Sequence, residues 1–158
     1  MNFRALGLAL AVALLAGCGR GKPPYEGKSV AELERMLDDP SPTVQAQGAF
    51  GLGRHGAEAR PAAPALVRAL KSPDALVRQQ AAVALGQVGA EEAVPALAEA
   101  LRDAEWSVRR QAAVALGQIG PPARSAEAGL HKCERDPNTV VRKAAREALG
   151  KIKGEAGR

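Results

Sequence analysis

Few residues in this sequence have side chains that could carry out catalytic chemistry. The chain has two cysteines, Cys18 and Cys133, and two histidines, His55 and His131. Two cysteines so far apart exclude a disulfide scaffold and a thiolate zinc site. Cys133 would need a base to act as a nucleophile, and His131, two residues away, would not face it on a helix. We therefore expect no catalytic residue, no metal site and no cofactor, and we expect both histidines to be solvated.

The composition indicates a helical protein rather than an enzyme. The chain has 158 residues, of which 46% are hydrophobic but only 3% are aromatic, and its formal net charge is +5. This length suits one domain. The scarcity of aromatic and β-branched runs is evidence against a β-sandwich or barrel. No glycine-rich phosphate loop, paired carboxylate or Ser/His/Asp pattern is found, and we identify no small-molecule substrate.

The first residues have the pattern of an export signal. Arg4 precedes 13 uncharged residues, 5–17, and a positive start followed by a short apolar run is typical of a signal peptide. That run is shorter than the roughly 20 residues that a membrane-spanning helix needs. It ends in Leu15-Ala16-Gly17-Cys18, which resembles the lipobox of bacterial lipoproteins. The resemblance implies that the Cys18 thiol receives diacylglycerol. The alternative is an ordinary signal peptide followed by an incidental cysteine.

The remaining chain divides into a linker and a repeated region. Residues 19–27 contain glycine, proline and charge without an apolar pattern, so we expect residues 18–28 to form the lipidated cysteine and a flexible tether. Residues 29–153 contain one motif four times, in units of about 29–56, 58–89, 90–120 and 121–153. The alignment rests on Val44, Val77, Val108 and Val141, which are 33, 31 and 33 residues apart.

Several other positions repeat in the same register. A leucine recurs eleven residues before the valine and another eight residues after it, at Leu33, Leu66, Leu97, Leu130 and at Leu52, Leu85, Leu116, Leu149. A glycine follows each of the second set, at Gly53, Gly86, Gly117 and Gly150. Leucines four apart share one helix face, so each unit should contain two helices. We infer that the repeated glycine lets the next unit approach closely, and that the glycine three residues later is a left-handed C-cap.

Helical hairpins of this kind bury their apolar faces only by stacking on neighbours. The sequence therefore predicts an all-α fold, an α–α superhelix of four helical hairpins. The shared pattern Asp-Pro, then Val-Arg, then Ala-Leu-Gly resembles HEAT repeats of the short bacterial type, known from phycobilisome lyases. That resemblance covers residues 29–153 and implies a HEAT-like solenoid. It implies no single activity, because scaffolds, lyases and hydroxylases share such repeats.

One repeat position carries arginine in three of the units. Arg78, Arg109 and Arg142 each follow the aligned valine, and Asp39, Asp103 and Asp136 lie five residues before it in their own units. The arginines could form a basic stripe for an anionic partner. The interpretation we favour is a structural ladder of Arg–Asp pairs within or between units, because the planar guanidinium matches a carboxylate.

Three other residues are candidates for binding a partner. Arg110 and Lys143 follow the ladder position and are expected on an exposed helix face. Trp106, the one tryptophan, stands where other units have small residues; it could anchor a partner or pack against the preceding unit. The two cations predict a partner protein with an acidic patch.

These observations favour a lipid-anchored protein-interaction scaffold of the bacterial cell envelope, on the periplasmic side and at the outer membrane if the cell is Gram-negative. One alternative is an enzyme or enzyme subunit resembling a phycobilin lyase. A hydroxylase resembling deoxyhypusine hydroxylase is disfavoured because the His-Glu pairs of that family are missing here. Nucleic-acid binding is a further alternative only if the chain is not exported; as an exported protein it is expected to bind none.

Overall fold

The computed structural model describes residues 22–154, and every regular element in that range is helical. The signal peptide, Cys18 and the first part of the expected tether lie outside the described residues. No helix within 22–154 is long and apolar enough to cross a membrane.

The helices form four consecutive pairs, which we call units 1 to 4. Their bounds are α2 (Val30–Met36) with α3 (Pro42–His55), α4 (Ala63–Ala69) with α5 (Ala75–Val88), α6 (Val94–Ala100) with α7 (Trp106–Ile119), and α8 (Glu127–Cys133) with α9 (Thr139–Ile152). Short 3₁₀ helices join the units: η1 (Gly56–Ala62), η2 (Glu91–Ala93) and η3 (Pro121–Ala126).

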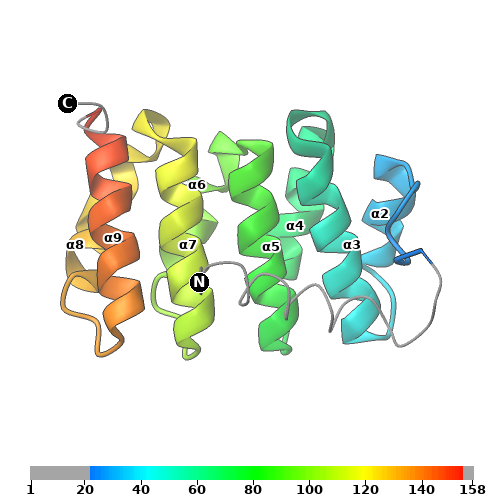
Figure 1. Cartoon of the computed structure of the whole chain (residues 1–158), viewed down its shortest axis with the longest axis horizontal. Coiled ribbons are helices and arrows are strands. Elements are labelled where there is room, and N and C mark those ends of the chain that lie inside the picture. Colours follow the sequence, from blue (N-terminus) through cyan, green and yellow to red (C-terminus); the bar gives the residue numbers. More distant parts are fainter. Residues whose placement is uncertain (1–21, 155–158) are drawn as a thin grey trace, which may run out of the picture.

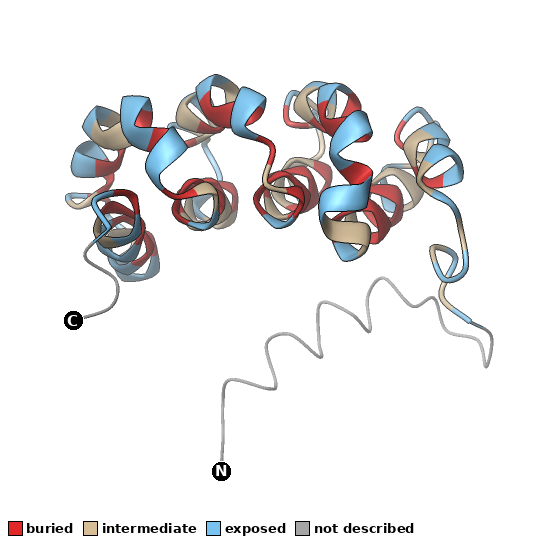
Figure 2. Cartoon of the chain, turned by 90° about the horizontal axis from the view of Figure 1, so that it is seen from above, coloured by how far each residue is buried: buried red, intermediate tan, exposed pale blue. Residues whose placement is uncertain are grey.

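The second helices of the units, α3, α5, α7 and α9, stand side by side in one row, and the first helices form a parallel row behind them (Figure 1). Viewed from above, the two rows follow a shallow curve with the second helices on its inner side, and buried residues lie where the rows meet (Figure 2). The predicted solenoid of four helical hairpins is confirmed.

The repeated leucines build the core between the two rows. Leu33, Leu66, Leu97 and Leu130 on the first helices, with Leu52, Leu85 and Leu116 on the second helices, are 0% exposed. Each such side chain stabilises the fold by about 1.5–3 kcal/mol when it leaves water. Leu149 in unit 4 remains 5% exposed, since no further described unit packs against that end.

The repeated glycines let neighbouring second helices approach closely. A Cβ atom on Gly86 would lie 2.7 Å from the Cα of Ala115, and one on Gly117 would lie 2.9 Å from the Cα of Ala148. Real Cβ atoms do not come that near to backbone, so the spacing of α5, α7 and α9 requires glycine here. Gly150 occupies the same repeat position in the last unit, and a Cβ there would meet nothing within 4 Å.

The glycines that end the second helices match the predicted left-handed C-cap only in part. Gly56, Gly89 and Gly120 all have positive φ, but only Gly89 is in the left-handed helical region, with φ 66° and ψ 41°. Gly56 and Gly120 have ψ of −135° and −140°, a region open essentially to glycine alone. At these two ends a 3₁₀ helix begins at once, so the chain turns more sharply than a helical C-cap allows.

The described part of the expected tether, residues 22–28, is not a free linker. The ring of Tyr25 packs edge-on against that of Phe50, with centroids 4.9 Å apart. The Lys28 carbonyl oxygen lies 3.0 Å from His55 Nε2. His55 was expected to be solvated, but its side chain is only 32% exposed because it holds this segment. Residues 22–28 therefore cover the N-terminal end of the array.

We expect Gly86→Ala to destabilise the protein and Gly150→Ala to stabilise it. At Gly86 the added methyl group overlaps α7, and overpacking of this kind costs about 1–3 kcal/mol. At Gly150 the methyl group meets open space, and alanine favours a helix over glycine by up to about 1 kcal/mol. Urea unfolding of the two variants measures both effects. Equal changes at the two positions would contradict the close-approach role of the repeated glycine.

Candidate functional site

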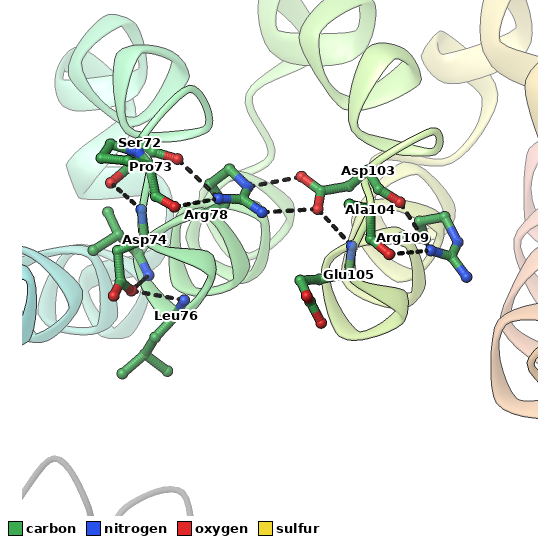
Figure 3. A network of polar contacts seen from close by, with 10 residues as sticks. Ser72, Pro73, Asp74, Leu76, Arg78, Asp103, Ala104, Glu105 and Arg109 are labelled. Carbon is green, nitrogen blue, oxygen red and sulfur yellow. Dashed lines mark hydrogen bonds and ion pairs between the residues drawn. The ribbon is translucent and has the colours of Figure 1, made fainter.

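At the positions of the expected Arg–Asp ladder, Arg78 of unit 2 and Asp103 of unit 3 form an ion pair with two parallel hydrogen bonds, which we call a two-pronged contact. Arg78 Nε donates to Asp103 Oδ2 at 2.7 Å, and Arg78 Nη2 donates to Asp103 Oδ1 at 2.9 Å (Figure 3). Both side chains are mostly buried, at 16% and 12% exposed. A guanidinium and a carboxylate in this parallel arrangement form one of the stronger polar contacts in proteins.

The same two side chains also hold the turns of their own units. Arg78 Nη1 donates to the carbonyl oxygens of Ser72 and Pro73, at 2.9 and 3.0 Å. Asp103 Oδ1 accepts the backbone N–H of Glu105 at 2.9 Å (Figure 3). Each ion pair is therefore part of a network that joins the turn of one unit to the turn of the next.

Units 3 and 4 are joined by an equivalent pair. Arg109 Nε and Nη2 donate to Asp136 Oδ2 and Oδ1 at 2.7 and 3.0 Å, and the Asp136 side chain is 7% exposed. The hydrogen bonds from Arg78 and Arg109 lower the pKa of Asp103 and of Asp136, respectively. The stabilisation is thus full above the pKa of about 3.9 of an aspartate in the unfolded chain, and it is lost as the pH falls through the lower folded-state value.

The first joint, between units 1 and 2, has no ion pair because both residue types change together. Gln45 stands where the arginine would be and Ser72 where the aspartate would be. Gln45 Nε2 still donates to the carbonyl oxygen of Asp39, at 2.6 Å. The turn bond is kept, and the two ladder positions of this joint hold neither a guanidinium nor a carboxylate.

Arg142 and Asp39, also expected in the ladder, form no ion pair with any described residue. Arg142 belongs to unit 4, and no described unit follows it to offer a carboxylate; Asp39 belongs to unit 1, and no described unit precedes it to offer an arginine. The ladder of this chain therefore consists of two ion pairs, and each pair connects neighbouring units rather than residues of one unit.

The residues proposed for partner binding lie at the start of the second helices. Trp106 begins α7 and is 45% exposed, so packing against the preceding unit does not cover it. Arg110 is half-buried and forms no ion pair with a described residue. Lys143 is 66% exposed, with its Nζ 3.8 Å from Glu147 Oε1. Leu76 and Val140, the second residues of α5 and α9, are exposed as well, at 39% and 43%, one position later in the repeat than Trp106.

The described cysteine and both histidines each contact a neighbouring group of the fold. Cys133 is buried, its Sγ lies 3.6 Å from the Leu101 carbonyl oxygen, and burial raises the pKa of its thiol. His131 contacts Glu134 through Nδ1 at 2.8 Å, which lowers the pKa of that carboxyl. Within residues 22–154, no three or more His, Cys, Asp or Glu side chains are grouped so that they could hold a metal ion.

We expect the Arg109–Asp136 pair to show strong coupling in a double-mutant cycle. Arg109→Gln and Asp136→Ser should each lower the free energy of unfolding by about 1–3 kcal/mol, because each leaves a mostly buried partner unsatisfied. The double variant restores the Gln and Ser combination of the first joint, so it should be less destabilised than the sum of the single variants, by about 0.5–3 kcal/mol. Urea unfolding measures the cycle, and strict additivity would argue against a joined network.

Solved structures similar to this chain are helical repeat proteins and proteins named for enzymes. Human deoxyhypusine hydroxylase is 32% identical, with a TM-score of 0.66, over 96% of this chain and 54% of that chain. A designed armadillo repeat protein in complex with the peptide (KR)4 is 22% identical, with a TM-score of 0.67, over 78% of this chain and 64% of that chain.

The complex of CpcE and CpcF of phycocyanin lyase from Nostoc sp. is a third similar structure, 20% identical with a TM-score of 0.62, over 87% of this chain and 68% of that chain. The chain thus spans about half to two thirds of the length of these solved chains. No curated protein sequence matches it significantly. The HEAT-repeat pattern matches residues 30–115 and 95–157, and together with the stacked helix pairs this shows that the chain belongs to the HEAT-repeat family.

Proposed function

We propose that this protein is a lipid-anchored interaction scaffold of the bacterial cell envelope, which binds an acidic protein segment across its row of second helices. The observation that carries the proposal is the exposure of one large apolar side chain at the start of each of α5, α7 and α9. Leu76, Trp106 and Val140 are 39%, 45% and 43% exposed. Tryptophan is enriched among the residues that dominate binding energy in protein interfaces.

The spacing of these three residues suggests the form of the partner segment. Neighbouring helices in such a row are about 10 Å apart. A chain in the polyproline II conformation covers that distance in about three residues, which is one full turn, and an α-helix covers it in about seven. A segment with apolar side chains at either interval could contact Leu76, Trp106 and Val140 in succession. We call these three residues the apolar row.

The charges beside the apolar row favour an acidic partner. Arg110 and Lys143 follow it on α7 and α9, and Arg54 and Lys151 are exposed near the other ends of α3 and α9. Glu147 offsets part of this charge through its ion pair with Lys143. Cations placed this way attract an acidic segment over about 8–10 Å at physiological salt. The similar armadillo protein was solved with a basic peptide, so an acidic partner would be the opposite preference.

The anchoring part of the proposal rests on the sequence alone. Residues 1–17 have the pattern of a signal peptide, and Cys18 follows the Leu15-Ala16-Gly17 run. The first helix of the array begins at Val30, twelve residues after this cysteine in the sequence. An anchor there would hold the array near the membrane surface while the second helices remain accessible.

We expect an acidic peptide with leucine at every third residue to bind the full chain and to shift the fluorescence of Trp106 to shorter wavelength. The signal is unambiguous because the chain has one tryptophan. The Arg110→Glu, Lys143→Glu double variant should bind at least about tenfold more weakly, since opposed like charges cost several kcal/mol, and its melting temperature should stay nearly unchanged.

Two controls make this titration specific. A basic peptide with the same leucine spacing should cause no shift, and Arg109→Glu should lower the melting temperature because Arg109 belongs to the ladder. If the basic peptide binds as well as the acidic one, or if the charge-reversed variant binds like the original chain, the proposed binding face is wrong.

We expect Cys18→Ser to release the protein from the membrane without changing its fold. A serine hydroxyl does not replace the cysteine thiol as the acceptor of the diacylglycerol group, and stable anchoring needs more than one lipid chain. Fractionation of cells, with mass spectrometry of the N-terminus, measures the change. A variant that remains membrane-bound and processed before residue 18 would rule out the lipoprotein assignment.

A further inference from the structure

The Arg–Asp ladder ends at unit 4 with an arginine that is already oriented. Arg142 Nη1 donates to the carbonyl oxygens of Asp136 and Pro137 at 2.7 and 3.0 Å. Arg78 and Arg109 make the same two turn bonds, and each then uses Nε and Nη2 to bind the aspartate of the next unit. In Arg142 the Nε and Nη2 donors form no bond to a described residue.

The ladder begins at unit 1 with Asp39, an aspartate that makes its turn hydrogen bond but has no arginine partner among the described residues. Asp39 Oδ1 accepts the backbone N–H of Ser41 at 2.8 Å. Asp103 and Asp136 accept the equivalent N–H groups at 2.9 and 2.8 Å while they also bind an arginine of the preceding unit. Asp39 forms no ion pair with a described residue, and beside it lies a hollow of about 270 Å³ lined by Lys28, Glu32, Arg35, Met36 and Asp39.

The residue types at the ladder positions make the two ends of the array complementary. Between units 1 and 2 the arginine and the aspartate are both absent, as Gln45 and Ser72. Between units 2 and 3, and between units 3 and 4, both are present and paired. The remaining arginine, Arg142 of unit 4, and the remaining aspartate, Asp39 of unit 1, are also both present. One combination, unit 4 followed by another unit 1, would pair every ladder residue.

Within the described residues 22–154, Arg142 and Asp39 are each partly exposed. Gly150 leaves open space on α9 where Gly86 and Gly117 receive a neighbouring helix. At unit 1, Gly51 holds the repeat position of Ala115 and Ala148, the residues that the repeated glycines meet, and Tyr25 covers it. A neighbouring copy would therefore meet unit 1 at the turn that carries Asp39, roughly 14 Å along α3 from Gly51, rather than at Gly51 itself.

We propose that copies of this chain associate head to tail, with Arg142 of one copy bound to Asp39 of the next through the same two-pronged contact that joins the inner units. The C-terminal end adds Arg146 and Lys153, with Glu134 and Glu147 as acidic neighbours. The N-terminal end adds Asp38 beside Asp39. A head-to-tail contact uses two different surfaces, so it continues into a ring or an open chain rather than stopping at a dimer.

A charge-swap experiment tests this contact. The full chain in detergent is studied by sedimentation velocity over a range of concentrations, alone and as the variants Arg142→Asp and Asp39→Arg. The original chain should form larger species as the concentration rises. Each variant alone should need at least about tenfold higher concentration to associate, because it opposes two like charges. An equimolar mixture of the two variants should associate like the original chain, since each swapped residue then meets its complement.

Several controls separate this contact from other causes. Arg102→Asp makes the same change of charge at an exposed position in unit 3 and should leave association unchanged. Association caused only by two chains sharing a detergent micelle would be the same in all variants. Melting curves check that the variants fold, with Arg142→Gln and Asp39→Asn as milder replacements. The inference is overturned if the original chain stays monomeric up to about 1 mM, if either variant associates like it, or if mixing restores nothing. The acidic-peptide titration of the apolar row does not depend on any of these results.

Discussion

The structure depends on the fact that no unit can bury its own apolar surface. Each helix pair has leucines on one side, and those side chains leave water only when a neighbouring unit covers them. The close spacing that this requires is set by Gly86 and Gly117, which let the backbone of the next second helix come within contact distance. Once the helices are that close, the turns at their ends are near enough to be joined by side chains.

The Arg–Asp pairs then tie local and long-range structure together. Asp136 accepts the N–H that opens its own second helix and also binds Arg109 of the preceding unit. Arg109 in turn holds the carbonyl oxygens of Asp103 and Ala104. A partly buried ion pair is weak evidence for stability by itself because its charges lose hydration. Here each charge is also hydrogen-bonded to backbone, which compensates that loss and specifies the register of neighbouring units.

Features that recur in the sequence could be predicted, and features that occur once could not. The helix pairs, the leucine core and the ladder positions repeat about every 32 residues, so their register identifies them. The docking of Tyr25 on Phe50 and of Lys28 on His55 happens once, at one end, and leaves no periodic trace. Leu76 and Val140 also escaped notice, because one apolar residue at the edge of an amphipathic helix looks like part of its buried face until neighbouring helices are placed. The direction of each ion pair, from one unit to the next, likewise required coordinates.

The neutral first joint gives the array an uneven response to its surroundings. Units 2, 3 and 4 are linked by contacts whose strength depends on the ionisation of Asp103 and Asp136, whereas between units 1 and 2 the ladder positions hold the neutral residues Gln45 and Ser72. Acid that protonates the carboxylates therefore loosens the inner joints and leaves the outer one as it was. The joint between units 1 and 2 therefore keeps its stiffness in acid, while the joints between units 2 and 3 and between units 3 and 4 soften together. Bending of the solenoid in acid would then be concentrated in the half of the array that carries Trp106, Arg110 and Lys143.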